Sequence, residues 1–218
     1  QNVGAYGQEV SNCIMTIKAF DTSTGQFIIL RGSDCQFAYR TCRFKTNDKS
    51  RFFIASVTFS VSKQAFERPY YDAIERYLRE NNQTIATPQD FRSVVVAIRT
   101  AKLPDPKLVA NNGSFFANPI VSDEVLVQIL AVNSGAKYWH LDGTDKVKLS
   151  AAWLVEQAGF KAYHDTETGM ATWPQHSLVL VNEHAKSTFD VLTFKTKIVA
   201  TVKEKFGVIL EQEPELLP

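Results

Sequence analysis

Alternating apolar and polar residues dominate the first third of the chain. From Cys13 to Phe20 the two kinds loosely alternate, residues 22–25 are turn formers, and the extended pattern resumes from Phe27 to Leu30. Residues 52–61 read FFIASVTFSV, rich in aromatic and β-branched residues. Because successive side chains of a strand point to opposite faces, this pattern predicts a hairpin followed by a longer strand.

Helical spacing replaces the alternation at residue 87. Thr-Pro-Gln-Asp offers an N-cap, a proline for the first turn and an acidic residue, and apolar residues then recur at three- and four-residue intervals up to Ile98. A helix ending near Thr100 is therefore predicted. The prolines at 104 and 106 disfavour helix on both sides, so we expect a domain boundary there.

Helices and short strands follow one another in the rest of the chain. Gly159 and Gly207 each follow a helical pattern, where a left-handed residue commonly ends the last turn. The predicted elements are helices at 123–131, 150–158 and 187–206 and strands at 177–182 and 208–211. The fold class expected from this order is α+β, with a β-rich first domain.

Charge and hydropathy exclude several classes of function. Lys and Arg number 24 against 23 Asp and Glu, so there is no cationic excess to neutralise a row of nucleic-acid phosphates. No run approaches the roughly 18 apolar residues that a membrane helix needs, and no targeting signal opens the chain, so a cytoplasmic protein is expected. Gln1 is not an initiator methionine, and we interpret the chain as a fragment or processed product.

The cysteine and histidine patterns do not predict a metal site. The three cysteines are odd in number and lack CxxC spacing, and the four histidines have no HExxH context. We expect reduced, buried thiols and no metal.

One serine stands in a sequence context that suits proton transfer. Ser114 follows a glycine in NNGSFFANP, where we expect a polar turn, and the two phenylalanines after it can anchor the segment and exclude water. Its hydroxyl is a candidate proton donor. The alternative is that this hydroxyl only bonds its own backbone in a turn.

Two basic segments are candidates for binding an anion. FAYRTCRFK places Arg40, Arg43 and Lys45 between aromatic residues, and RTAKLPDPK places Arg99 and Lys102 near a helix C-terminus. Such cations can hold a carboxylate or a diphosphate. Taken by itself, the first group is better explained as a solvated basic edge, and the helix dipole alone explains the second.

Three glutamates alternate at the end of the chain. Glu211, Glu213 and Glu215 would point to one face of the predicted last strand. One of them could be a buried acid, or the whole face could meet water.

Seven segments in one order resemble the UDP-N-acetylenolpyruvoylglucosamine reductase (MurB) family. They are QNVGAYG, FAYR with the FK that follows, RTAKLPDPK, NNGSFFANPIVS, KLSAAWLVEQAGFK, SLVLVN and FGVILEQE. The resemblance runs from Gln1 to the last strand, and it implies that the glycine-rich N-terminal part of the FAD domain lies outside this sequence.

The resemblance also implies a domain plan. Residues 1–103 would be the C-terminal part of the FAD-binding domain, including a tyrosine-bearing substrate loop at 66–89. Residues 104–207 would form the substrate-binding domain. Residues 208–218 would be a C-terminal strand with the catalytic glutamate.

The implied reaction reduces UDP-N-acetylglucosamine enolpyruvate to UDP-N-acetylmuramate for peptidoglycan, with NADPH reducing the FAD. Hydride would add to the outer enolpyruvyl carbon. By match to the family pattern, Arg40 and Glu213 would stabilise the developing charge and Ser114 would protonate the adjacent carbon.

Binding residues follow from the same resemblance. The cofactor contacts implied are Gln1, Asn2, Gly4, Ala5 and Arg99. The substrate contacts implied are Tyr70, Tyr71, Lys102, Asn118 and His176. At His176 some members of the family have glutamine.

Two other functions are compatible with the sequence. A non-catalytic UDP-sugar-binding module would keep the substrate domain without a complete cofactor site, and bound flavin would argue against it. Another flavoprotein of the same superfamily, acting as an oxidase, is disfavoured by GSFFANP and by the lack of a flavin-attachment motif.

Overall fold

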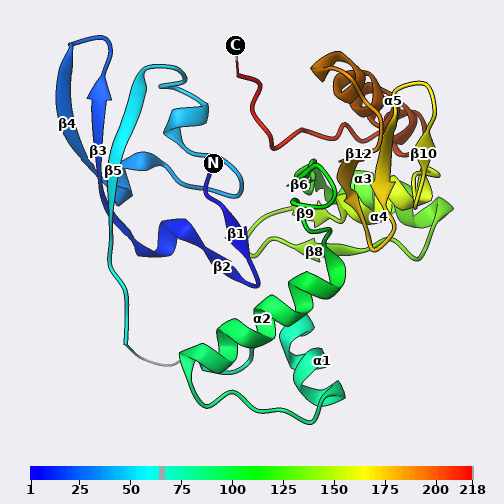
Figure 1. Ribbon diagram of the computed structural model, residues 1–218, viewed down its shortest axis with the longest axis horizontal. Coiled ribbons are helices and arrows are strands. Elements are labelled where there is room, and N and C mark those ends of the chain that lie inside the picture. Colours follow the sequence, from blue (N-terminus) through cyan, green and yellow to red (C-terminus); the bar gives the residue numbers. More distant parts are fainter. Residues whose placement is uncertain (64–66, 218) are drawn as a thin grey trace. The chain divides into compact units, whose positions relative to one another are not determined.

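The computed structural model describes residues 1–63 and 67–217, and it confirms the predicted α+β class. The chain forms two compact units, Gln1–Ile98 and Arg99–Pro218, so the division falls within helix α2 (Pro88–Lys102). Figure 1 shows small antiparallel sheets and separate helices along the chain. In the part of the chain that is described, no helix has the length and hydropathy needed to cross a membrane. The domain limits expected from the sequence remain predictions.

The sheet of the first unit contains the hairpin and the strand predicted from alternation. It comprises β3 (Ile14–Asp21), β4 (Gln26–Arg31) and β5 (Phe52–Phe59), in the antiparallel order β4-β3-β5. Ile17 and Ala19 are buried on one face, where they pack with Cys35. The smaller elements of this unit are β1 (Gly4–Ala5), β2 (Gln8–Glu9) and the 3-10 turns η1 (Val10–Cys13), η2 (Gly32–Cys35) and η3 (Arg43–Lys45).

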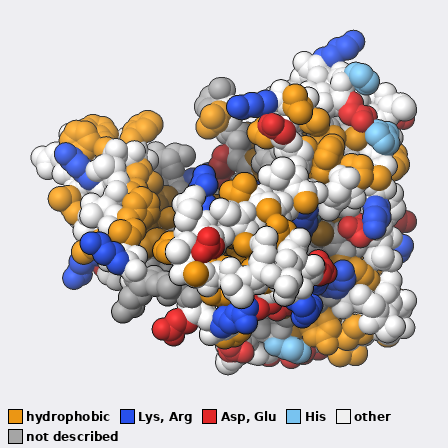
Figure 2. Space-filling model, turned by 60° about the horizontal axis from the view of Figure 1, so that its bottom comes forward, with side chains coloured by type: hydrophobic (Ala, Val, Ile, Leu, Met, Phe, Trp, Pro, Cys, Tyr) orange, Lys and Arg blue, Asp and Glu red, His pale blue; other side chains and the backbone are white. Residues whose placement is uncertain are grey.

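The opposite face of this sheet carries exposed aromatic side chains. Phe20 of β3 lies between Phe27 of β4 and Phe53 of β5 in the strand register. Phe27 is 60% exposed and Phe53 is 69% exposed. Figure 2 shows hydrophobic side chains at the surface of this part of the molecule, at the left of the view. Among the described residues, none buries these two rings.

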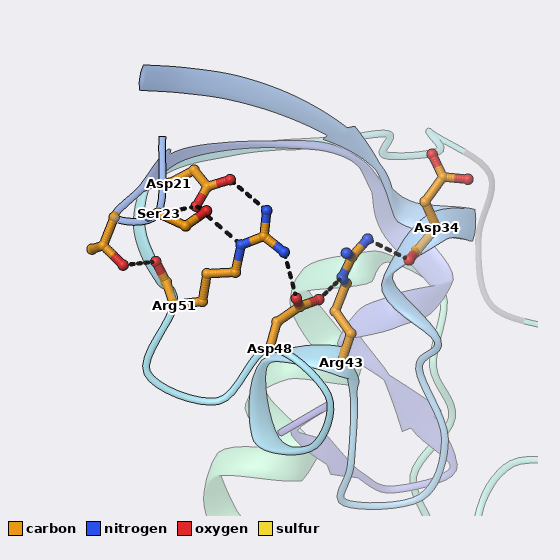
Figure 3. Close-up of polar contacts among 7 residues, drawn as sticks. Asp21, Ser23, Asp34, Arg43, Asp48 and Arg51 are labelled. Atoms are coloured by element: carbon orange, nitrogen blue, oxygen red, sulfur yellow. Dashed lines mark hydrogen bonds and ion pairs between the residues drawn. The ribbon is translucent and has the colours of Figure 1, made fainter. Parts of the chain in front are cut away.

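An ion-pair network fixes the end of the hairpin to the segment before β5 (Figure 3). Arg51 Nη2 lies 2.7 Å from Asp21 Oδ2, and its Nη1 lies 3.2 Å from Asp48 Oδ1. Asp48 in turn accepts a 2.6 Å bond from Arg43 Nε. The hydrogen bond from Arg51 is the largest cause that holds the pKa of Asp21 well below its usual range. Arg43 and Arg51 therefore have a structural role, since together they cross-link neighbouring loops of the first unit.

Helix α2 begins as the sequence predicted. Thr87 Oγ1 accepts from the Asp90 N–H at 3.1 Å, and Asp90 Oδ2 accepts from the Thr87 N–H at 2.9 Å. These reciprocal bonds satisfy N–H groups that the first turn leaves unpaired. Helix α1 (Asp72–Glu80) packs on α2 through Ile74, Leu78 and Val94.

The segment predicted as a tyrosine-bearing loop, residues 66–89, is partly helical, because it contains α1. Apolar residues at helical spacing bury this segment against α2, which the sequence interpretation overlooked. Phe66, the first residue of the predicted loop, lies outside the described residues.

Two antiparallel sheets belong to the second unit. The strands of the first, in sheet order, are β10 (His164–Asp165), β11 (Met170–Trp173), β12 (His176–Asn182) and β6 (Asn111–Ser114). The strands of the second are β7 (Ile120–Ser122), β9 (Lys146–Leu149) and β8 (Tyr138–His140). Met170, Leu178 and Leu180 point from the first sheet into the main core.

The helices of this unit confirm the three predicted at 123–131, 150–158 and 187–206. They are α3 (Asp123–Val132), α4 (Ala151–Gln157) and α5 (Thr188–Phe206). Ser187 and Asp190 form a capping box at the start of α5, and Gly207 ends it at φ 69°. Phe194, Ile198 and Val202 are fully buried, so the predicted apolar stripe faces the core.

Two local expectations were wrong. Asn111–Ser114 is strand β6 and not only a polar turn, because it pairs with the edge of β12. The expected strand at 208–211 forms no ladder; Gln212 instead makes one isolated bridge to Phe116. Both outcomes depend on pairing partners distant in the sequence, which local periodicity cannot supply.

Candidate functional site

The predicted proton donor and the predicted catalytic glutamate lie on paired segments. The Glu213 N–H donates to the Phe115 carbonyl at 2.8 Å, and the Ala117 N–H donates to the Glu211 carbonyl at 2.9 Å. Ser114 immediately precedes Phe115 and is held by the register of β6 on β12. The backbone thus brings Ser114 and Glu213 together in the second unit.

Two phenylalanines anchor this arrangement. Phe115 is 3% exposed and Phe116 is 1% exposed, and their rings meet edge to face at 5.2 Å. Ser114 itself is half-buried. Because both rings are fixed in the core, the serine has little freedom to move along the strand.

Burial separates the three terminal glutamates. Glu213 is half-buried, whereas Glu211 and Glu215 are exposed. The alternation from the sequence would have placed all three on one face, but the segment is not a regular strand. This difference in exposure favours Glu213 as the acid of the site.

Asn118 follows Phe116 by two residues. Its side-chain Oδ1 accepts the Ala151 N–H at 2.9 Å, at the start of α4. The oxygen therefore helps to satisfy the first turn of α4 beside the cap Ser150, whose side chain accepts from the Trp153 N–H.

Lys102 and His176 are neighbours in the second unit. The Trp173 indole Nε1 donates to the Lys102 carbonyl at 3.1 Å, and Trp173 is the register partner of His176. Burial, followed by the charge of Lys102, lowers the pKa of His176 to about 4. His176 is therefore neutral near pH 7, and like glutamine it can donate a hydrogen bond without adding charge.

Arg99 is exposed on the last turns of α2. Within the second unit the structure thus brings together Lys102 and His176, and separately Ser114 and Glu213, while Arg99 points to solvent.

Arg40 is joined to the predicted cofactor segment in the first unit. Its guanidinium donates to the Gly4 carbonyl at 2.7 Å and to the Asn2 carbonyl at 3.2 Å. A Cβ at position 4 would come within 3.1 Å of Arg40 Nη1 and 2.9 Å of the Gln8 carbonyl. Glycine is required there because the guanidinium and the hairpin backbone approach so closely.

Arg40 also has an unusual backbone. Its φ is 53°, in the left-handed region that non-glycine residues seldom adopt. Such strain persists only when the surroundings hold the residue, and it is concentrated at functional sites. Of the other cations in FAYRTCRFK, Arg43 is committed to Asp48, and Lys45 reaches the Gln1 amide oxygen at 3.4 Å.

Asn2 is a structural residue of the β1-β2 hairpin. It is 2% exposed, its side-chain nitrogen donates to Glu9 and to the Ala38 carbonyl, and its oxygen accepts from the Ser11 N–H. These bonds use the side chain fully, so a cofactor would meet only the backbone of Asn2. Gln1 and Ala5 are exposed.

The two tyrosines differ in their surroundings. Tyr70 is half-buried and packs edge to face on Phe91 at 5.7 Å, whereas Tyr71 is 49% exposed and meets Tyr6 at 5.8 Å. Tyr71 is the one with a surface left to cover a ligand.

A cavity of about 770 Å³ adjoins the predicted cofactor segment in the first unit. Its lining includes Gly4, Ala5, Val10 and Val61. This volume lies within the range of small-molecule and cofactor sites, and largely apolar walls suit a ring system. Among the described residues no cluster of His, Cys, Asp or Glu is arranged to hold a metal ion.

Comparison with known proteins identifies the family. The model of the UDP-N-acetylenolpyruvoylglucosamine reductase C-terminal domain matches residues 105–217, just over half of the chain. The chain belongs to this reductase family. The resemblance seen in the sequence is thereby confirmed.

Relatives of known name agree with the reductase family. A UDP-N-acetylenolpyruvoylglucosamine reductase of Xylella fastidiosa (strain 9a5c) is 37% identical over 217 residues, which are all of this chain and 61% of the relative. One from Alcanivorax borkumensis is 38% identical over 221 residues and is covered to 62%. This chain thus spans about three fifths of the length of the curated relatives it matches.

A solved structure supports the fold of the reductase family. The crystal structure of UDP-N-acetylenolpyruvylglucosamine reductase (MurB) from Thermus caldophilus matches with a TM-score of 0.57 at 18% identity, over 100% of this chain and 57% of that one. At this identity the match establishes the fold alone.

Three residues near Lys102 and His176 were missed in the sequence. Glu156 of α4 accepts a 3.2 Å hydrogen bond from the fully buried Ser177, and Trp173 holds the end of α2. Glu156 follows an apolar stretch of α4, and nothing in the local pattern marks it. Its neighbours in space come from strand β12 and from the end of α2.

Proposed function

We propose that this chain carries the substrate-binding and proton-donating residues of an FAD- and NADPH-dependent UDP-N-acetylenolpyruvoylglucosamine reductase. The observation that supports this most is the backbone pairing that sets Ser114 beside Glu213 in a chain of this family. The product would be UDP-N-acetylmuramate, a peptidoglycan precursor.

The cofactor part of the proposal is supported by the first unit. The cavity beside Gly4 and Ala5 has the size and the apolar lining that an isoalloxazine or adenine ring requires. When bound there and reduced by NADPH, FAD would supply hydride to the outer enolpyruvyl carbon. The diphosphate of FAD would additionally need convergent backbone N–H groups.

Ser114 would complete the reduction. Hydride addition leaves an electron pair on the carbon next to the substrate carboxylate, and the Ser114 hydroxyl would donate a proton to that carbon. The fixed rings of Phe115 and Phe116 would keep water away from this step. The overall change is then addition of two electrons and two hydrogens across the carbon–carbon double bond.

Charge and binding roles are proposed for the remaining residues. Glu213 and Arg40 would stabilise the charge that develops on the enolpyruvyl carboxylate. Lys102 and Asn118 would hold the nucleotide diphosphate, His176 would lie beside the nucleotide, and Tyr71 would cover the substrate. Arg99 is proposed to contact flavin or carboxylate on the family pattern.

A chimera tests the proposal. This chain is joined to the part of the Xylella fastidiosa reductase that lies outside the match, and NADPH oxidation is followed with and without UDP-N-acetylglucosamine enolpyruvate. We expect substrate-dependent oxidation by the chimera, and weak flavin binding by the 218-residue chain alone. Flavin absorbance reports whether the chimera has folded around its cofactor.

A flavin-loaded chimera that does not respond to the substrate would contradict the reductase. The non-catalytic UDP-sugar-binding module would then gain support, since Lys102, Asn118 and His176 all belong to the second unit. Tight stoichiometric flavin binding by the chain alone would contradict the assignment of the cofactor segment.

A further inference from the structure

Lys102 interacts electrostatically with three other ionisable side chains, Lys137, Glu156 and His176. Lys102 comes from the end of α2, Lys137 from the segment before β8, Glu156 from α4, and His176 opens β12 itself. Within this group, Glu156 is the carboxylate whose charge affects the pKa of Lys102. A single carboxylate near two lysines can set how strongly the site attracts an anion.

Trp173 links the backbone of Lys102 to the backbone of His176. The Trp173 indole donates to the Lys102 carbonyl, and Trp173 pairs with His176 at the hairpin of β11 and β12. The last turn of α2 is therefore attached to the strand on which His176 lies.

Glu156 is held against the same strand. Ser177, which follows His176, is completely buried and its hydroxyl donates to Glu156 Oε1 at 3.2 Å. Lys161 Nζ approaches Glu156 Oε2 at 3.7 Å, but the Lys161 side chain is 65% exposed. An ion pair so exposed contributes little to stability. The position of the Glu156 carboxylate is therefore better explained by its hydrogen bond with the buried Ser177.

Electrostatics connects Glu156 with Lys102. Desolvation at the ammonium lowers the pKa of Lys102, although much of the side chain is exposed, and Lys137 lowers it further. The Glu156 carboxylate acts in the opposite direction and raises this pKa. The His176 imidazole is neutral near pH 7 and adds no positive charge.

We propose that Glu156 is a positioning residue of this site: its carboxylate, fixed by Ser177, keeps Lys102 in the charged form that binds a nucleotide diphosphate. This inference rests on the proposed function for the identity of the anion. The charge-setting role itself concerns only residues of the second unit. Glu156 does not contact the ligand; it acts through Lys102.

Removal of the Glu156 charge has two opposing effects. A neutral residue no longer repels the incoming phosphates, so UDP binding at pH 6 is unchanged or tighter. The same change lowers the pKa of Lys102 further, so Lys102 loses its proton at a lower pH than in the wild type. At the alkaline end UDP binding then becomes weaker, on the order of tenfold, as expected when a charge-assisted hydrogen bond is lost.

The experiment uses the 218-residue chain and four variants. Glu156→Gln removes the charge, Glu156→Asp retains it, and Ser177→Ala removes the hydrogen bond that holds it. Glu204→Gln makes the same charge change at an exposed position of α5. The Lys102 pKa is measured without nucleotide by NMR of ¹³C-labelled lysine, assigned with Lys102→Arg, and UDP binding is measured calorimetrically from pH 6 to 10.

We expect Glu156→Gln to lower the Lys102 pKa. Its curve of UDP affinity against pH should cross that of the wild type between pH 6 and 10. Glu156→Asp should restore most of both properties, and Ser177→Ala should fall between wild type and Glu156→Gln. Glu204→Gln should match the wild type. An unchanged Lys102 pKa in folded Glu156→Gln would overturn the inference.

The two proposals fail in different ways. If the Lys102 pKa falls as expected but the wild type does not bind UDP at any pH, the charge-setting role stands and the nucleotide assignment fails. If UDP binds but every variant shows the same pH profile, the nucleotide assignment stands and Glu156 is only a partner of Lys161.

Discussion

The Glu213 N–H donates to the carbonyl of Phe115 across 2.8 Å, and Phe115 directly follows Ser114. This single bond connects the end of the chain with the GSFFANP segment, about a hundred residues earlier. The backbones of both candidate catalytic residues of the second unit are thus held by strand-like pairing.

Glu213 is predicted to matter for turnover far more than Glu215. Glu213 is half-buried beside the Ser114 segment, whereas Glu215 is exposed. In the chimera, Glu213→Gln should reduce kcat by roughly 10²-fold or more, the scale of a positioned acid or charge stabiliser. Glu215→Gln should change kcat by less than about threefold, because surface substitutions seldom perturb a site. The reverse ranking would place the catalytic acid two residues later.

Ser114 is predicted to donate the proton after hydride transfer. In the chimera, Ser114→Ala should leave UDP-sugar affinity nearly unchanged while kcat falls by roughly 10²-fold or more. Ser114→Cys should recover part of kcat, since a thiol can also deliver a proton. Steady-state kcat and substrate affinity are measured for all three proteins. An alanine variant within a few-fold of wild type would make Ser114 a structural residue of β6.

His176 is predicted to act as a neutral group. Its pKa of about 4 lies below the value of about 6.5 for an unfolded histidine, so the unfolded chain takes up a proton first as the pH falls. His176→Gln should therefore gain stability relative to wild type as the pH falls from about 6.5 to 4, with UDP affinity near pH 7 within a few-fold. Urea unfolding at several pH values and calorimetry measure these effects. An imidazole that titrates near 6.5 in the folded protein, seen by NMR, would contradict the prediction.

The ion pair of Lys197 with Asp165 is predicted to stabilise the second unit. Lys197 Nζ lies 2.7 Å from Asp165 Oδ1, and the Asp165 side chain is 3% exposed. Burial alone would raise the pKa of Asp165, but the bonds from Lys197 and Thr168 outweigh it, and the pKa is lower than usual. Lys197→Met leaves the carboxylate buried without its cation. The variant should therefore lower the free energy of unfolding by about 2–4 kcal/mol at pH 7.

The pH dependence of this loss provides its check. A carboxyl group with a lowered pKa in the folded state stabilises the protein above its unfolded pKa of about 3.9, and this contribution disappears as the pH falls through the folded value. The difference in the free energy of unfolding between wild type and Lys197→Met should therefore become smaller as the pH falls from 7 to 3. Lys203→Met, at an exposed position of α5, is the control and should cost less than about 0.5 kcal/mol. A difference that is independent of pH would exclude the ion pair as its cause.

Local sequence determined the elements whose signals lie close together in the chain. The capping residues Ser187 and Asp190, the apolar stripe through Phe194 and Ile198, and the stop at Gly207 define α5 without any distant partner. The hairpin of β3 and β4 is likewise encoded by alternation and a turn. These features depend on interactions within a few residues, and such interactions can be identified in the sequence.

Tertiary structure alone decided how the candidate site is assembled. Asn111–Ser114 became a strand because β12 offered an edge, and the segment of Glu213 paired with Phe115 instead of forming the expected strand. Glu156 reached Ser177 because α4 packs on β12. Each of these contacts joins residues at least 20 positions apart, and their energies depend on burial and pairing geometry that arise only when the chain has folded.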